Sequence, residues 1–293
     1  MKKKKKKVGQ IILNGVFVVL MFIYIVPVVT LISSSLMDET ALMQNGYSFL
    51  PLEFSLKAYE AAFRRPDQMI RAYGVTIFVS VISTVLSTLI VALLAYPLSR
   101  KNFLWRKQLN FMVYFTMLFN GGMVPAYLLI SNVLKLSDTI WALILPGMIS
   151  GYYVMVMRTS YASLPDELIE AAKIDGASEL FICFKIVIPL TKASLSSIAF
   201  LFFVARWNDW QHTMLYIRNP NLYTLQYLVQ KLLREADALK NFADMSMSMG
   251  GEVIPSETLR MAVAVLSAAP VLCIFPFFQK YFTKGLTIGG VKG

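Results

Sequence analysis

Charged side chains are scarce in this chain of 293 residues. Asp, Glu, Lys and Arg together make up 15% of it, whereas an ordinary soluble domain carries about a quarter. Hydrophobic residues reach 57%, and the mean hydropathy is +0.59. An apolar excess of this size without matching charge argues against a soluble globular protein and indicates a chain solvated by a lipid bilayer.

Residues suited to catalysis or metal binding are also few. The chain has two cysteines, Cys183 and Cys273, in separate apolar surroundings, and its one histidine is His212. Neither residue type has the ligand spacing of a zinc site, so the cysteines are expected to be small buried residues. No Ser/His/Asp set stands out, and we predict no catalytic or metal-binding residues.

A phosphate-binding loop is missing as well. The sequence contains no Gly-x-x-x-x-Gly-Lys-Ser/Thr motif. The glycine-rich end, Gly289–Gly293, lacks the helix that would have to follow it. We therefore expect no cofactor in this chain, and a nucleotide phosphate would have to be bound by another protein.

Positive charge is concentrated at one end. The net charge is +11, and six of the positive charges come from the run Lys2–Lys7. A nucleic-acid-binding surface needs basic residues interleaved with aromatic or base-reading side chains. Here the basic run abuts an apolar segment instead, so no nucleic-acid partner is predicted.

Six apolar segments follow along the chain. Each has roughly the 18–25 residues that span hydrocarbon as a helix, and all but the fifth lack Asp, Glu, Lys and Arg. The segments are about Ile11–Leu36, Tyr73–Leu98, Leu109–Leu134, Thr139–Met157, Ala193–Ile217 and Met261–Phe278. In lipid every backbone polar group needs an internal partner, so these segments are helices. The sequence predicts an all-α integral membrane protein with six transmembrane helices.

The first segment also fits a second pattern. A lysine-rich start followed by an apolar run is typical of a signal peptide, and Ser33–Ser35 are small enough for cleavage. The apolar run, however, exceeds the 7–15 residues usual for such a signal. We therefore predict a retained first helix.

The distribution of Lys and Arg predicts the orientation. With the N-terminus inside, 17 of these residues fall on the inner side and 10 on the outer side, which favours cytoplasmic termini in a bacterial plasma membrane. The predicted parts are a basic N-terminus (1–10), a six-helix domain (11–282) and a C-terminal tail (283–293). Within the domain we predict a long inner loop (158–190) and a long outer loop (218–258).

The long inner loop has its own helical signals. Ser163 and Asp166 have the spacing of a capping box, and a helix is expected over Leu164–Asp175. Gly176 stands where a left-handed residue would end that helix. A second helical stretch is expected from Ala177. From the residues alone, the loop is either a docking surface for another protein or a hairpin that caps its own bundle.

A family resemblance decides between these interpretations. Glu170-Ala171-Ala172, Gly176, Ile186, Ile188 and Pro189 resemble the EAA motif of ABC importer permeases, with Ile188 in place of the usual Leu. The resemblance implies the type I ABC importer permease fold and a coupling helix that seats on a cytoplasmic ATPase. The residues that it assigns to ATPase coupling are Leu168, Glu170, Ala171, Ala172, Asp175, Gly176 and Pro189.

The resemblance extends to most of the chain. Leu50-Pro51, Asn120–Pro125, Trp207–Trp210 and the C-terminal residues from Phe277 are similar to sugar permeases of the maltose type, the last of these to their Lpl/Ytc-like branch. It implies an oligosaccharide substrate, a second homologous permease as a heterodimer partner, two ABC ATPase subunits and an extracellular solute-binding protein.

Polar residues interrupt two of the spans. Arg206, Asn208, Asp209 and Gln211 lie in the fifth segment with Trp207 and Trp210, and intramembrane charge is costly unless it meets a partner or a watery cavity. We predict that these six residues and Asn120 line the substrate path. An interfacial belt or a subunit contact is the alternative. Asn120, Gly121, Gly122 and Pro125 are expected to kink or unwind the third span.

Two other classes of function remain as alternatives. A passive channel or secondary transporter would not need the EAA loop. An integral membrane enzyme would need clustered titratable residues at membrane depth, and only Arg206, Asp209 and His212 qualify. We therefore predict a permease subunit that is not itself an enzyme.

Overall fold

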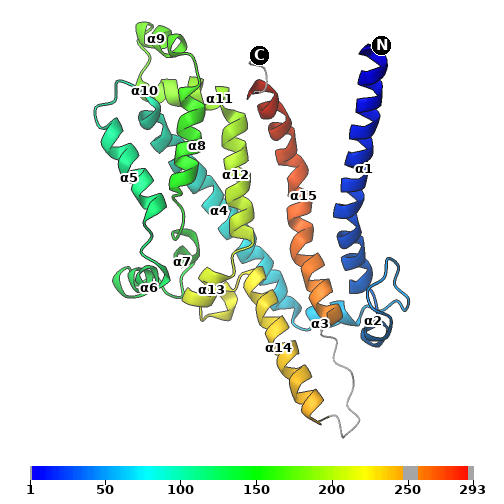
Figure 1. Ribbon diagram of the computed structural model, residues 1–293. Coiled ribbons are helices and arrows are strands. Elements are labelled where there is room, and N and C mark those ends of the chain that lie inside the picture. The colour runs from blue at the N-terminus through cyan, green and yellow to red at the C-terminus, as the bar shows by residue number, and fades with distance from the viewer. Residues whose placement is uncertain (1, 247–256, 290–293) are drawn as a thin grey trace. The chain divides into compact units, whose positions relative to one another are not determined.

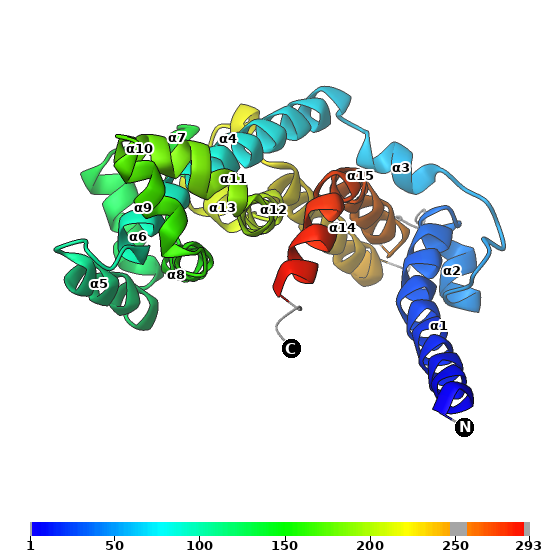
Figure 2. The same ribbon diagram turned by 90° about the horizontal axis from the view of Figure 1, so that it is seen from above.

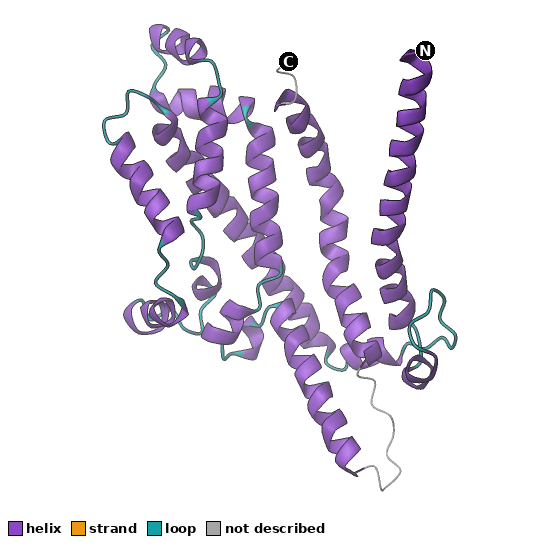
Figure 3. Ribbon diagram, viewed as in Figure 1, coloured by secondary structure: helices purple, strands orange, loops and turns teal. Residues whose placement is uncertain are grey.

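The computed structural model describes residues 2–246 and 257–289, and these are nearly all helical (Figure 3). They form two compact units, one from Met1–Pro66 with Val229–Pro270 and the other from Asp67–Leu228 with Val271–Gly293. The helices are α1 (Lys2–Ser35), α2 (Glu39–Asn45), α3 (Lys57–Ala62), α4 (Pro66–Ser99), α5 (Arg106–Leu118), α6 (Met123–Leu128), η1 (Leu129–Val133), α7 (Trp141–Ile144), α8 (Gly151–Ala162), α9 (Asp166–Ile174), α10 (Glu179–Phe181), η2 (Ile182–Val187), α11 (Ile188–Leu190), α12 (Lys192–Trp207), α13 (Gln211–Tyr216), η3 (Pro220–Leu222), α14 (Leu225–Ser246) and α15 (Glu257–Gly289).

Three helices are long and apolar enough to cross a membrane: Ile12–Ser35, Pro66–Ser99 and Glu257–Gln279. Two bent helix pairs bring the number to five if each pair is one span. By length and composition, the described residues therefore account for three of the six predicted spans, or for up to five if each bent pair is one span. The remaining one, about Thr139–Met157, is divided between α7 and α8.

The ends of the chain are more helical than predicted. Helix α1 begins at Lys2, so the basic residues that were assigned to a separate segment continue the first helix. Helix α15 runs to Gly289, and only 290–293 of the predicted tail lie outside the described residues. The predicted outer loop, 218–258, contains the whole of α14, and its stretch 247–256 also lies outside the described residues.

The predicted break in the third span is confirmed. Helix α5 ends at Leu118, and the chain bends by 110° before it continues from Met123. Gly122 occupies the left-handed region with φ +89°, which glycine adopts without steric cost. Its N–H donates to Oδ1 of Asn120 at 2.9 Å. The asparagine and the glycine therefore close this turn together.

The fifth span is shorter than predicted. The sequence suggested one helix to Ile217, but α12 ends at Trp207 and a separate helix α13 begins at Gln211. The helical stretch that precedes α12 meets it at 83° after Pro189. In Figure 2, α12 is seen nearly end-on whereas α10 and α11 lie across the view. The loop before α12 thus includes a helix that runs roughly perpendicular to the span.

The core of the second unit is formed by α4, α8, η2 and α12. Its buried apolar residues include Val91, Val154, Ile182, Val187 and Phe202. Where these helices lie in lipid, close packing of such side chains holds them together, because burial there does not remove them from water. This shared core fixes the position of the loop between α8 and α12 against the spans.

The last carbonyls of α4 need partners because a helix end leaves them without intrahelical donors. The carbonyl oxygen of Leu98 accepts from Nε of Arg106 at 3.2 Å and from Nε of Arg158 at 3.1 Å. Arginines from α5 and α8 thus converge on the end of α4. Their positive charge also suits a helix C-terminus.

In the first unit a buried carboxylate caps a helix. Glu39 of α2 is 5% exposed. Its carboxylate accepts from the backbone N–H groups of Glu257 and Thr258, both at 2.9 Å, and from the Thr258 hydroxyl at 2.6 Å. The first residues of α15 therefore obtain from another helix the acceptors that their own helix cannot supply.

Many side chains of α1 are exposed although they are apolar. Phe17 is 60% exposed and Phe22 is 59% exposed. Scattered exposed apolar residues are ordinary on any protein, but a whole apolar helix exposed in this way requires lipid or another membrane protein around it.

Gly151 provides a test of how closely α5 and α8 pack. A Cβ atom added there would lie 2.9 Å from Cγ of Met117 and 3.1 Å from the carbonyl oxygen of Val113. We expect Gly151→Ala to lower the unfolding free energy by about 1–3 kcal/mol, because α5 would have to shift. Gly74→Ala is the matched control, since nothing lies within 4 Å of the added atom. Equal melting temperatures for both purified variants would contradict the packing.

Candidate functional site

The predicted coupling helix is α9, which lies beyond the ends of α8 and α12 at one end of the second unit (Figure 1). It begins at Asp166 rather than Leu164. The predicted capping box is wrong, because Ser163 ends α8 and its hydroxyl donates to the carbonyl of Ser160 at 2.8 Å. Pro165 occupies the N-cap position without a side-chain hydrogen bond. Asp166 and Glu167 lie in the first turn, where the helix dipole favours negative charge.

The C-terminus of α9 ends as predicted. Gly176 has φ +78°. Its N–H donates to the carbonyl of Lys173 at 3.0 Å, and the N–H of Ala177 donates to the carbonyl of Ala172 at 2.9 Å. These two bonds are the Schellman pattern. No atom lies within 4 Å of a Cβ added to Gly176, so glycine is needed here for its backbone conformation and not for space.

The two faces of α9 have different roles. Ile169 is 5% exposed and joins the core of the second unit, with Ala172 packed beside it. On the other face Leu168 is 46% exposed and Ile174 is 86% exposed, while Glu170 and Ala171 are also exposed. Ile169 and Ile174 were missed by the sequence reasoning, although their spacing of five residues already placed them on different faces.

Two ion pairs hold the ends of α9. Nζ of Lys101 lies 2.8 Å from Oδ2 of Asp166, and both side chains are exposed. The hydrogen bond from Lys101 lowers the pKa of Asp166 below its ordinary value, and the same bond raises the pKa of Lys101. At the other end, Nζ of Lys173 lies 2.5 Å from Oε1 of Glu179.

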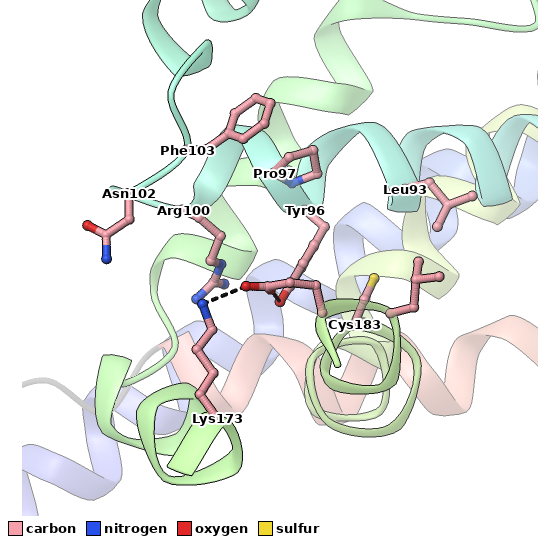
Figure 4. Close-up of a pocket in the computed structure, with 10 residues that line it drawn as sticks. Leu93, Tyr96, Pro97, Arg100, Asn102, Phe103, Lys173 and Cys183 are labelled. Atoms are coloured by element: carbon pink, nitrogen blue, oxygen red, sulfur yellow. Dashed lines mark hydrogen bonds and ion pairs between the residues drawn. The ribbon is translucent and has the colours of Figure 1, made fainter. Parts of the chain in front are cut away.

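Glu179 extends the second ion pair to α4. Its Oε2 accepts a hydrogen bond from the hydroxyl of Tyr96 at 2.6 Å. The chain Lys173–Glu179–Tyr96 therefore connects the end of α9 to the end of a membrane-spanning helix (Figure 4). Sequence reasoning did not identify Glu179, because it occupies a position between Gly176 and Ile186 that the EAA motif does not specify, and because Tyr96 is distant in sequence.

Most of the predicted substrate-path residues line one cavity of about 400 Å³ at the junction of α12 and α13. Its predicted lining residues are Arg206, Asn208, Asp209, Trp210 and Gln211. Tyr153, Phe202 and His212 also contribute. Asn120 is not among the lining residues, and its side chain instead accepts from Gly122 in the turn before α6.

Charge in this cavity is paired within the chain. Arg206 is 7% exposed, and its Nη1 lies 3.4 Å from Oδ2 of Asp209. The same guanidinium donates to the carbonyl of Pro146. Asp209 also contacts the ring of His212. Because Arg206 reaches a backbone carbonyl in the break between α7 and α8, it holds that break against α12.

The uncharged predicted residues differ in their access to the cavity. Trp207 is 1% exposed and stacks on Phe203 at 5.9 Å between ring centroids. Its ring therefore has no access to a sugar, contrary to our expectation. The Asn208 side chain donates to the Val204 carbonyl at 3.0 Å and accepts from Gln226 at 3.3 Å. Gln211 is exposed and lines the cavity.

Comparison with known proteins identifies the family. The family described as binding-protein-dependent transport system inner membrane component matches residues 72–288. Protein LplC of Bacillus subtilis (strain 168) is 36% identical over 271 residues, 92% of this chain and 90% of that protein. The polygalacturonan/rhamnogalacturonan transport system permease protein YtcP of the same organism is 34% identical over 289 residues, 99% of this chain and 100% of that protein.

A solved structure agrees with these relatives. The crystal structure of a bacterial ABC transporter involved in the import of the acidic polysaccharide alginate has a chain with a TM-score of 0.79 and 28% identity, covering 94% of this chain and 97% of that chain. This chain therefore belongs to the family of binding-protein-dependent transport system inner membrane components, with the type I fold. It is a membrane permease, not an enzyme, and its family implies a partner permease, an ATPase and a solute-binding protein.

The left-handed conformation at Gly176 generates the first prediction for this site. Gly176→Val should uncouple ATP hydrolysis from uptake, because a β-branched residue is strained at φ +78°. Gly176→Asn is the matched control, since asparagine tolerates this conformation, and should keep more of the coupling. The measurement is substrate imported per ATP hydrolysed by the reconstituted importer. Equal coupling in Gly176→Val and wild type would show that this helix end does not transmit the signal.

Tyr96 and Tyr161 offer a matched pair of substitutions. Both belong to the same core cluster, but only the Tyr96 hydroxyl donates to a carboxylate, whereas the Tyr161 hydroxyl is buried with no hydrogen-bond partner among the described residues. Tyr96→Phe should cost about 1 kcal/mol of unfolding free energy. Tyr161→Phe should cost nothing or stabilise. Thermal unfolding of the purified variants measures the difference, and the reverse order would disprove the assigned contacts.

Proposed function

We propose that this chain forms one half of the translocation path of an ATP-driven importer for oligosaccharides. The observation that supports this most directly is α9. It is anchored through the buried side chain of Ile169, whereas the ion pairs at its two ends are exposed and contribute little. Leu168 and Ile174 are exposed on this helix, and exposed apolar side chains on a helix packed against the core are expected of a docking element.

The other half of the path comes from a homologous permease, with which this chain forms a heterodimer. Two ABC ATPase subunits bind ATP and Mg²⁺, because this chain has no phosphate-binding loop. One of them receives α9 in a surface groove. The residues that make this contact are Leu168, Glu170, Ala171 and Ile174, whereas Ala172, Gly176 and Pro189 shape the loop that presents them.

A carbohydrate substrate is supported by the relatives. Their names include a polygalacturonan/rhamnogalacturonan permease and an arabinooligosaccharide permease, and the similar solved transporter is involved in alginate import. The cavity beside α12 fits this class, because it combines the indole of Trp210 with the amide of Gln211. Aromatic faces and amides are suited to sugar rings and hydroxyls.

In the proposed orientation both termini and α9 are cytoplasmic, and α14 is on the outer side. Helix α14 buries Leu225, Leu228 and Val229. Its polar residues include Lys231 and Glu235, and Nζ of the lysine lies 3.9 Å from Oε1 of the glutamate. An amphipathic helix in a long outer loop is a docking element for the extracellular solute-binding protein. The exposed apolar surface of α1 contacts membrane lipid.

A passive channel or secondary transporter is the alternative function. Such a protein would have no use for α9 as an ATPase-docking helix. Uptake into proteoliposomes separates the two, because the proposed importer moves sugar only when the ATPases, ATP and the binding protein are all present. Flux through this chain without ATP would replace the proposal with the alternative.

Substitutions in the cavity test its role in the path. Trp210→Ala and Gln211→Ala should each reduce uptake several-fold while the complex still assembles, because they remove side chains from the cavity wall. Trp141→Ala is the matched control, since Trp141 is 49% exposed but does not line the cavity. Arg206→Gln should instead impair assembly, because it removes buried contacts to Asp209 and Pro146. Normal uptake by both cavity variants would remove the path assignment.

A further inference from the structure

A second cavity, of about 550 Å³, lies between the end of α4 and the coupling loop (Figure 4). Its apolar wall consists of Leu93, Pro97, Phe103 and Leu180. Its polar lining residues are Tyr96, Arg100, Asn102, Lys173 and Glu179. The cavity therefore has an apolar side and a charged side, and none of the roles described above uses the space between them.

Positive charge exceeds negative charge in this cavity. In Figure 4, Arg100 extends from the end of α4 and Lys173 from α9 toward the same region. Glu179 is the one carboxylate that lines the cavity, and it already contacts Lys173 and Tyr96. Two cations facing a single carboxylate leave one positive charge uncompensated.

Arg100 is the cation of this cavity without a directly bonded carboxylate, although Glu179 and Asp166 lie within electrostatic range of it. Its guanidinium lies over the Tyr96 ring at 5.3 Å and donates to the Ser99 hydroxyl at 3.0 Å and the Tyr161 carbonyl at 3.3 Å. In the part of the chain that the structure describes, it forms no ion pair with a carboxylate. These contacts hold the guanidinium in place and leave its charge available to an anion, for which arginine is well suited.

The location of Arg100 indicates which kind of anion it would bind. Arg100 directly follows Ser99, the last residue of the apolar helix α4, so it lies where the hydrocarbon ends. The segment 100–107 contains four cations and no acidic residue. Within it, Leu104 is 83% exposed and Trp105 is 59% exposed. Exposed apolar and tryptophan side chains among basic residues are typical of the lipid headgroup region.

We propose that this cavity binds an anionic phospholipid of the cytoplasmic leaflet. The lipid phosphate contacts Arg100 and the amide of Asn102, and an acyl chain follows the wall formed by Leu93, Pro97 and Leu180. A free phosphate would satisfy only the charged side and leave the apolar wall in water, whereas a phospholipid matches both. The assignment of the lipid to the cytoplasmic leaflet rests on the orientation proposed above.

The lipid has a consequence for coupling. Its binding residues belong to α4, to the segment after α4 and, through Lys173 and Leu180, to the coupling loop. A molecule that contacts all three restricts their relative movement. Anionic lipid that binds in this cavity should therefore also increase the amount of sugar imported per ATP hydrolysed.

Native mass spectrometry of the complete importer tests the binding. The complex is titrated with phosphatidylglycerol, and phosphatidylcholine is the neutral comparison. We expect retained phosphatidylglycerol that Arg100→Gln weakens by at least about tenfold, as expected for a lost charge-assisted contact. Asn102→Asp, at an exposed residue, should weaken it similarly by placing an anion beside the phosphate. Lys107→Gln is the matched control, because it removes a cation of the same segment that does not line the cavity.

The outcomes separate the sources of phosphate and the two proposals. Equal losses in Lys107→Gln and Arg100→Gln, equal retention of phosphatidylcholine, or full competition by millimolar inorganic phosphate would each overturn the lipid site. Nanodiscs with and without phosphatidylglycerol then measure sugar imported per ATP, and an unchanged ratio would overturn the effect on coupling. Lipid retention is measured without transport, so it stands or fails independently of the oligosaccharide importer function.

Discussion

A backbone N–H or carbonyl in lipid must find a partner inside the protein, and much of the polar chemistry of this chain follows from that constraint. Its spans are interrupted, and each interruption frees backbone groups that need a partner other than their own helix. Polar side chains lie at those places. Asn120 accepts from the N–H of Gly122 in the break of the third span, and Arg206 donates to the carbonyl of Pro146 in the break between α7 and α8.

The same constraint operates at helix ends. Thr76 of α4 accepts from the N–H of Leu225, the first residue of α14, at 2.7 Å. Two arginines donate to the carbonyl of Leu98 at the end of α4, and Glu39 accepts from the start of α15. Apart from Arg106, which is eight residues from Leu98, the partners come from distant parts of the sequence. Backbone satisfaction therefore also fixes tertiary contacts, and a polar residue in these spans has a structural role before it has a functional one.

Sequence patterns predicted the features that depend on local chemistry. Apolar runs without charge predicted the long apolar helices α1, α4 and α15. Gly176 predicted the end of α9, because only a residue without Cβ adopts φ +78° at no cost. The predicted capping box is wrong, because Ser163 is the C-cap of the preceding helix and its hydroxyl donates to the carbonyl of Ser160. The contact between Glu179 and Tyr96 was not predictable, since it joins residues that only folding brings close together. The nearly complete burial of Trp207 was not predicted either.

If the cavity beside α12 belongs to the substrate path, as proposed above, its side chains meet both structural and transport demands. Its charged groups, Arg206 and Asp209, are engaged with one another and with Pro146 and His212. These charged groups therefore interact with other parts of the protein and stabilise the broken helices. Exposed Gln211 and the Trp210 ring remain as neutral lining groups. A translocation path must bind its substrate strongly enough to admit it and weakly enough to release it. Neutral contacts meet that requirement, because an open cation at this depth would hold an acidic ligand too firmly to let it pass.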